Sequence, residues 1–177
     1  SLGGEAVLPG GIRATVDRVD EAMLARAVEF LRNPTAFDDV PSPPGFTGEL
    51  RPYQQKGLNW LAGMASLPLG AVLADDMGLG KTIQVLALLQ HLRSERAAAG
   101  EDTGRVLVTC PTSLIGNWQR ELERFAPELR VHVHHGPMRE ARASQLDGHD
   151  VVVTSYGLVA RDREMLATID WSVVVFD

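Results

Sequence analysis

The sequence predicts an α/β protein with a mainly parallel sheet and helices on both faces, and three observations support this. Short apolar runs alternate with segments of helical spacing from residue 50 onward. The runs are continuous rather than alternating with polar residues, as in strands that are covered on both sides. The stretch LADDMGLGKT, residues 73–82, puts a glycine-rich loop between an apolar run and a helix, which is typical of phosphate-binding folds.

The amino-terminal part of the chain differs from the rest in composition and in hydrophobic pattern. Residues 1–16 are glycine-rich and lack a pattern, so we expect an extended or poorly ordered lead-in. Residues 19–33 carry apolar residues at helical spacing, and the proline-rich stretch 37–50 indicates either a linker or a wrapped loop. We therefore predict an amino-terminal extension over 1–48, with a helix at about 20–33, and a domain over 49–177.

The elements of the predicted domain follow from periodicity. Helices are indicated where apolar residues recur three or four positions apart, as at Ile83, Leu86 and Leu89. Strands are indicated by short valine-rich runs such as 105–110. In order, we predict a helix from Pro52, a strand at 70–74, a helix at 81–99, a strand at 105–110, a helix at 113–126, a strand at 130–135, a helix at 138–146, a strand at 150–156, a helix at 157–169 and a strand at 171–177.

Composition and charge restrict the function. The 177 residues, 45% hydrophobic and 23% charged, are ordinary for a globular domain. The single cysteine, Cys110, excludes an internal disulfide framework and fits a reducing compartment. No apolar run approaches the roughly 18 residues of a membrane span, so we expect no membrane partner. A net charge of −6 argues against a general basic coat for nucleic acid but permits a local basic groove.

The loop carries the groups that a phosphate site needs. Gly78 and Gly80 can adopt positive φ and leave room for phosphate oxygens beside bare backbone. The helix beginning near Lys81 directs its positive end at the anion. Lys81 supplies a charge for the outer phosphates, and the Thr82 hydroxyl can bind Mg²⁺. Asp75 stands where the usual pattern has glycine, but that position only shapes the turn. The alternative is a glycine-rich turn with a surface lysine, which would give these groups no ligand to bind.

Four segments in order resemble the Swi/Snf family of helicase-like ATPases in superfamily two. They are LRPYQQKGLNWL, LADDMGLGKT, VLVTCPTSLIGNWQREL and VVVTSYG. The resemblance covers about Leu50 to Asp177 and implies a RecA-like P-loop lobe. In that family the nucleotide loop typically begins with Asp, so Asp75 is expected.

The resemblance implies ATP as the nucleotide. The family's glutamine motif falls on Gln54, after Tyr53, in a region that contacts adenine in relatives. An amide can read a base edge with two hydrogen bonds and an aromatic ring offers a stacking surface; the alternative is a polar residue on a packing helix, and Gln55 is adjacent. The predicted nucleotide-binding residues are Tyr53, Gln54, Asp76, Met77, Gly78, Leu79, Gly80, Lys81, Thr82 and Ile83.

The resemblance also implies contacts with the DNA backbone. Segments after two strands would provide hydroxyl groups, and the helix start after the first would provide N–H groups. For Trp118, core packing is the preferred interpretation. The predicted DNA-binding residues are Thr112, Ser113, Arg139, Thr154 and Ser155.

The last strand, VVVFD, resembles the family's acidic box, in which the first Asp holds Mg²⁺ and the next Glu orients water. The resemblance makes Lys81 and Asp177 the catalytic residues, and Thr82 and Asp177 the magnesium ligands. We expect the strand carrying Asp177 to lie beside the strand leading into Asp75. The chain is expected to be a fragment that binds nucleotide but hardly hydrolyses it, since an arginine finger alone contributes roughly 10³–10⁵ in turnover.

The predicted function is that of an ATP-binding lobe in a DNA-stimulated ATPase and translocase. Its expected cofactors are ATP and Mg²⁺, and its expected partners are double-stranded DNA and a DNA-bound protein complex that it remodels or displaces. The expected location is the cytoplasm and nucleoid in a bacterium, or the nucleus in a eukaryote. The alternatives are a non-enzymatic P-loop binding module and a small-molecule P-loop kinase; the latter would need an arginine-bearing lid and no upstream glutamine motif.

Overall fold

The computed structural model describes residues 4–8, 12–16, 39–67, 70–76, 78–136 and 143–177. The helix predicted at about 20–33 lies outside the described residues, as do Met77 and Arg139. The described helices and strands are β1 Gly4–Leu8, β2 Ile12–Val16, α2 Pro52–Ala65, α3 Lys81–Ala98, β3 Arg105–Cys110, η1 Thr112–Leu114, α4 Ile115–Phe125, β4 Val131–His134, η2 Ala143–Leu146, β5 Val151–Ser155, α5 Tyr156–Arg161, α6 Arg163–Leu166 and β6 Trp171–Phe176.

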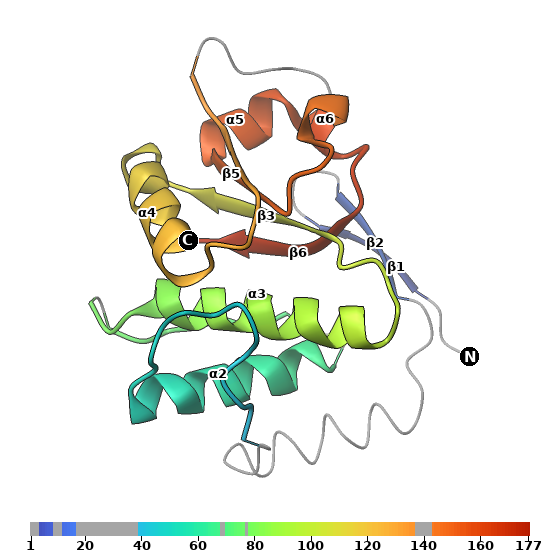
Figure 1. Ribbon diagram of the computed structural model, residues 1–177. Helices are drawn as coiled ribbons and strands as arrows, with labels where there is room; N and C mark the ends of the chain where they lie inside the picture. The colour runs from blue at the N-terminus through green and yellow to red at the C-terminus, as the bar shows by residue number, and fades with distance from the viewer. Residues whose placement is uncertain (1–3, 9–11, 17–38, 68–69, 77, 137–142) are drawn as a thin grey trace.

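Four strands form one all-parallel sheet in the order β4-β5-β3-β6. Val106 of β3 is in register with Val151 of β5 and Val173 of β6. The helices α2 and α3 lie on one side of this sheet, and α5 and α6 lie on the other (Figure 1). The prediction of a parallel sheet with helices on both faces is therefore confirmed.

Alternate residues of the central strands supply two separate cores. One core contains Val106, Val108 and Cys110 of β3. They belong to a large cluster with Leu58 of α2, Leu86 of α3, and Trp118 and Leu122 of α4. Leu107 and Val152 point the opposite way, to a smaller cluster with Leu146, Leu166 and Ile169. Because both sides of β3 and β5 are covered, these strands read as continuous apolar runs in the sequence.

The amino-terminal residues form a separate small sheet. β1 and β2 pair antiparallel, with Ala6 opposite Ala14. An extended lead-in was the expectation for residues 1–16, and the two extended segments are hydrogen-bonded to each other as strands.

The proline-rich stretch after residue 38 wraps onto the helices. Gln55 Nε2 donates to the Val40 carbonyl over 2.7 Å, and Gln90 Nε2 donates to the Gly45 carbonyl over 3.0 Å. Phe46 is buried in the large core and stacks on Phe125 with ring centroids 6.1 Å apart. Of the two sequence interpretations, the contacts favour the wrapped loop, which joins α2, α3 and α4.

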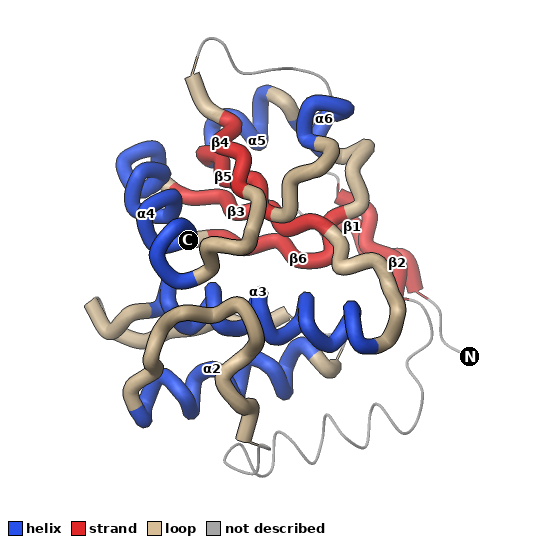
Figure 2. Tube along the Cα trace, in the orientation of Figure 1, coloured by secondary structure: helices blue, strands red, loops and turns tan. Residues whose placement is uncertain are grey.

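The predicted strand at 70–74 is wrong. Residues 70–76 run as loop between α2 and α3 (Figure 2), and β6 is the last strand on its side of the sheet. An apolar run becomes a strand only when it finds hydrogen-bonding partners, and here Gly70–Leu73 does not pair with β6, although both line one cavity. The expectation that the strands leading to Asp75 and Asp177 are neighbours is also wrong in this structure.

Two predicted helices are divided. The segment 113–126 begins as the 3₁₀ turn η1 before α4, and 157–169 breaks at Asp162 into α5 and α6. The residue at the second break makes a long-range contact, because Asp162 Oδ2 lies 2.8 Å from Nε2 of the fully buried His134. Among the described residues, no helix combines the length and apolarity required to cross a bilayer.

Candidate functional site: a phosphate loop facing the end of the last strand

The glycine-rich loop has the backbone conformation that its sequence predicts. Gly78 has φ of 85° and Gly80 has φ of 78°, both in the left-handed region that favours glycine. Gly80 is also the residue that precedes the first turn of α3. A Cβ atom at position 80 would lie 2.5 Å from Gln54 Nε2, so the backbone angle favours glycine there and a larger residue would also displace the Gln54 side chain.

Lys81 and the two aspartates shape the loop. Lys81 Nζ donates to the carbonyl oxygens of Asp75 and Asp76 at 2.8 and 3.2 Å. Asp75 Oδ2 accepts a hydrogen bond of 3.0 Å from Gln84 Nε2, and the Gln84 side chain is fully buried on α3. The carboxylate at the unusual first position of the loop is thus tied to the helix that the loop precedes, which gives Asp75 a structural role.

Gln54 joins the helix α2 to the loop. Its Oε1 accepts from the Arg51 N–H at 2.9 Å, and its Nε2 donates to the Leu79 carbonyl at 3.0 Å. Gln55 instead donates to Val40, so the glutamine that touches the loop is Gln54. Gln54 therefore positions the loop through both ends of its amide, and because each end can make a second hydrogen bond, the two-bond reading of adenine stays a prediction. The adjacent Tyr53 is 39% exposed.

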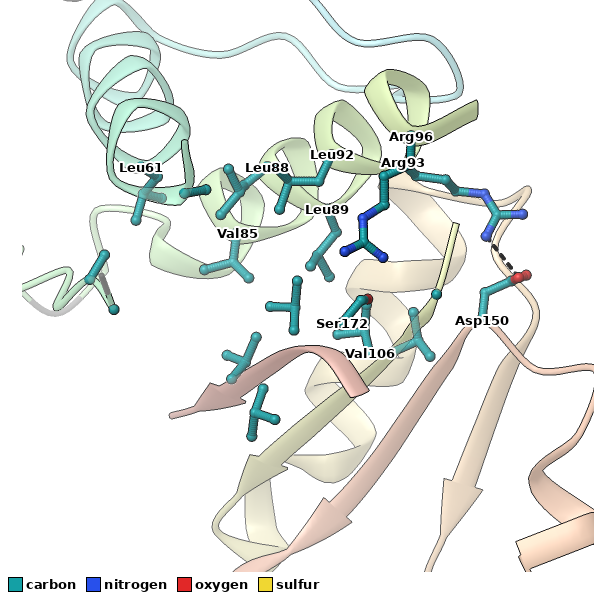
Figure 3. Close-up of a pocket in the computed structure, with 18 of the residues that line it drawn as sticks. Leu61, Val85, Leu88, Leu89, Leu92, Arg93, Arg96, Val106, Asp150 and Ser172 are labelled. Atoms are coloured by element: carbon teal, nitrogen blue, oxygen red, sulfur yellow. Dashed lines mark hydrogen bonds and ion pairs between the residues drawn. The ribbon is translucent and has the colours of Figure 1, made fainter. Parts of the chain in front are cut away.

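One large cavity connects the loop to the end of β6. Its volume is about 1070 Å³, and Lys81, Thr82 and Asp177 line it together. Figure 3 shows the apolar interior, where Val85 and Leu89 of α3 point toward the sheet that carries Val106, and Leu88 and Leu92 point to the side where Leu61 lies. The polar groups at the loop end suit a phosphate, whereas the apolar stretch between α3 and β6 does not.

Ion pairs lie at another part of the cavity lining, where Arg93 and Asp150 meet. Arg93 Nη1 lies 2.8 Å from Asp150 Oδ1 (Figure 3), and Arg130 Nη2 lies 3.0 Å from the same oxygen. Burial raises the pKa of Asp150, but the hydrogen bonds from Arg130 and Arg93 outweigh it and lower the pKa to about 2. Asp150 is therefore an anion whose charge is compensated.

Asp177 is held at the other end of the sheet. Its Oδ2 accepts from Trp118 Nε1 at 2.8 Å, its carbonyl accepts from the Tyr156 hydroxyl at 2.7 Å, and its N–H donates to the Thr109 carbonyl at 2.9 Å. Thr82 and Asp177 offer a hydroxyl and a carboxylate, oxygen ligands of the kind that Mg²⁺ takes. The types of donor present thus suit the predicted metal, and the assignment of Thr82 and Asp177 as its ligands stays a prediction.

The residues predicted to contact DNA fall into two groups. Thr112 and Ser113 are exposed in η1, just before α4. Thr154 is fully buried, and its hydroxyl donates to the His134 carbonyl at 3.0 Å. The Thr154 side chain is committed within the sheet, which argues against a phosphate contact, and Ser155 is 6% exposed.

Sequence reasoning missed two functional candidates. Gln84 looked like an ordinary polar residue of a helix; its signal was its position three residues after Lys81, facing back toward the loop. Trp118 was assigned to packing, and it is indeed 2% exposed. Its indole N–H, however, reaches Asp177, 59 residues away, and nothing in the sequence spacing indicates that bond.

The all-parallel sheet and the glycine loop opening α3 define an α/β lobe of the P-loop class. A family model described as the SNF2-related domain matches residues 53–177. The chain belongs to this family, which confirms the prediction made from the four motifs.

Individual relatives agree with the family match. YwqA of Bacillus subtilis, a candidate ATP-dependent helicase/translocase, is 44% identical over 153 residues, which cover 83% of this chain and 16% of YwqA. The helicase SWR1 of Eremothecium gossypii is 40% identical over 144 residues, covering 78% of this chain and 9% of SWR1. The chain thus spans less than a fifth of the length of these relatives.

A solved structure shares the fold. The SWI2/SNF2 ATPase core of Sulfolobus solfataricus in complex with double-stranded DNA superposes with a TM-score of 0.67 at 37% identity. The match covers 80% of this chain and 28% of the Sulfolobus chain. The RecA-like α/β lobe expected from the motifs is therefore confirmed.

Proposed function

We propose that the full-length protein containing this chain is a DNA-stimulated ATPase that moves on double-stranded DNA and remodels or displaces bound proteins. This lobe binds the ATP and its Mg²⁺. The observation that carries the proposal is the phosphate loop itself: Gly78 and Gly80 at positive φ, Lys81 at the start of α3, and Asp177 across the same cavity.

The loop explains how a triphosphate would be held. The first N–H groups of α3 have no partners within the helix and are available to phosphate oxygens. Lys81, now bound to two loop carbonyls, would exchange them for phosphate oxygens. The Asp75 carboxylate is held in place by Gln84 but keeps its charge, so Mg²⁺ and the backbone N–H groups would have to outweigh its repulsion of the anion. Tyr53, exposed beside Gln54, would offer a stacking surface to the base.

The roles in hydrolysis follow from the oxygen ligands. A Mg²⁺ bound with ATP supplies charge neutralisation at the transferred phosphoryl group. Thr82 and Asp177 would hold that ion, and Lys81 would stabilise charge on the outer phosphates. DNA backbone contacts are assigned to Thr112, Ser113 and Ser155, which lie at or beside helix starts.

Relatives support the DNA part of the proposal. The Sulfolobus core was solved with duplex DNA, and a relative in Schizosaccharomyces pombe, 37% identical over 159 residues, is the TATA-binding protein-associated factor mot1. The first supports binding of duplex DNA, and the second supports an association with a DNA-bound protein.

The test compares the chain's two lysines. Lys81→Ala should weaken ATP binding about 10- to 100-fold, because hydrogen bonds to charged groups contribute about 1.5–3 kcal/mol. Lys56→Ala removes the same charge from an exposed position on α2 and should leave affinity unchanged. Fluorescent ATP titration gives the affinities. Equal affinity of Lys81→Ala and the unaltered protein would contradict the nucleotide site.

Turnover separates the proposed function from its alternatives. In the full-length protein, added duplex should raise ATP hydrolysis. Binding without turnover would favour the non-enzymatic module, and phosphoryl transfer to a small molecule, indifferent to duplex, would favour the kinase.

A further inference from the structure

We propose that Trp118 and Tyr156 are positioning residues for Asp177, fixing its carboxylate and its backbone so that it can bind the metal ion. The inference rests on the proposed function, because it assumes that Asp177 is a ligand of Mg²⁺. Figure 1 shows the end of the chain beside α4, the helix that carries Trp118.

The indole ring of Trp118, which donates the hydrogen bond, is fixed by the core around it. The indole is 2% exposed and packs in the large core with Leu122, one turn further along α4. A buried indole N–H needs an acceptor, and a carbonyl would satisfy it, as Leu166 does for Trp171 at 2.8 Å. Trp118 instead donates to a carboxylate oxygen at the site. A bond to one oxygen from a fixed ring restricts rotation of the Asp177 carboxylate.

Tyr156 fixes the backbone. It is the first residue of α5, directly after β5, and its hydroxyl reaches the Asp177 carbonyl at 2.7 Å. In the strand order β5-β3-β6, this bond spans the strand between them. Together with the 2.9 Å bond between the Asp177 N–H and the Thr109 carbonyl, it ties the end of the edge strand to the two strands beside it.

The donors are neutral, which leaves the charge of Asp177 available. Among the described residues, no Arg or Lys forms an ion pair with it. A hydrogen bond from a neutral group orients a carboxylate without neutralising it, as the outer partners of metal ligands do.

Trp118 and Tyr156 both lie close in sequence to residues that are predicted to contact DNA. Trp118 follows the predicted DNA segment Thr112–Ser113 on the same helical stretch, and Tyr156 follows Ser155. A shift of either segment would therefore move a group that holds Asp177. Linkage requires that such an effect be reciprocal between duplex and metal-bound nucleotide.

The test measures metal affinity in the full-length protein. Mn²⁺ replaces Mg²⁺, and electron paramagnetic resonance counts free Mn²⁺ in the presence of a non-hydrolysable ATP analogue. Trp118→Phe keeps the packing and removes the N–H; it should weaken Mn²⁺ binding at least about 10-fold, as loss of an outer partner does. Binding of the analogue in EDTA should not change. Trp171→Phe, which loses an indole bond of equal length to Leu166, should change neither.

The outcomes are separable. Unchanged Mn²⁺ affinity in Trp118→Phe overturns the proposal, and so does an equal loss of analogue binding with and without metal, which a packing defect would cause. If Trp118→Phe fails to fold, Tyr156→Phe at a 48% exposed position decides: reduced Mn²⁺ affinity supports the proposal and unchanged affinity overturns it. If the unaltered protein binds the analogue no better than Lys81→Ala, the proposed function itself fails.

Discussion

Two aspartates at opposite ends of the sheet differ in what surrounds their charge. Asp150 stands before β5 and accepts hydrogen bonds from two arginine side chains, Arg93 and Arg130. Asp177 stands after β6 and accepts from an indole and a phenol. The first carboxylate is compensated and joins α3 and the residue before β4 to the start of β5, whereas the second is oriented by neutral donors. Burial separates them as well, because Asp150 is buried and Asp177 is exposed, but the charge of the donors decides whether the carboxylate is compensated.

The largest expected effect is on catalysis by Asp177. Asp177→Asn in the full-length protein should lower ATP turnover more than about 100-fold, because loss of an outer partner of a metal ligand already costs about 10–100-fold. Asp170→Asn, at the exposed residue before β6, is the control. Steady-state hydrolysis with saturating duplex measures both. Turnover within a few-fold of the unaltered protein would assign the metal to other ligands.

Asp150 should show the opposite behaviour, with a loss of stability and retained nucleotide binding. Asp150→Asn should lower the free energy of unfolding by about 3 kcal/mol, near the low end for breaking a buried ion pair, because Arg93 and Arg130 can reach solvent. Urea unfolding of the chain measures the change. Asp147→Asn breaks the exposed pair with Arg105 and should cost less than about 1 kcal/mol. Similar losses in both variants would contradict a special role for Asp150.

Sequence reasoning succeeded where the signal is local. The parallel sheet follows from valine-rich runs. The loop follows from Gly78, Gly80 and Lys81, because residues this close in the sequence form the phosphate loop without long-range contacts. It failed for 70–74, because an apolar run does not reveal whether a strand will pair with it. Pairing depends on the space beside β6, which in this structure is a cavity.

The contacts within the site were the least predictable part. Gln54, predicted to contact the adenine, lies at the loop, but its bonds to the Leu79 carbonyl and the Arg51 N–H were not predicted. The bond between Trp118 and Asp177 joins segments 59 residues apart. Such bonds arise from the packing of α4 against the sheet, and no pattern of residue types records them.

The smallest expected effect concerns pH and follows from Asp150 alone. Its folded pKa, about 2, lies below the ordinary 3.8, so the folded state binds this proton less readily than the unfolded chain. The associated stability is complete above about pH 4 and is lost as pH falls toward 2, amounting to about 2 kcal/mol. Unfolding should therefore be compared for the unaltered chain and Asp150→Asn across this range. Because other carboxylates titrate in both proteins, the informative quantity is the difference between them, which should shrink as pH falls. A difference that stays constant with pH would mean that the Asp150 ion pairs do not depress its pKa, and the contrast with Asp177 would then rest on geometry alone.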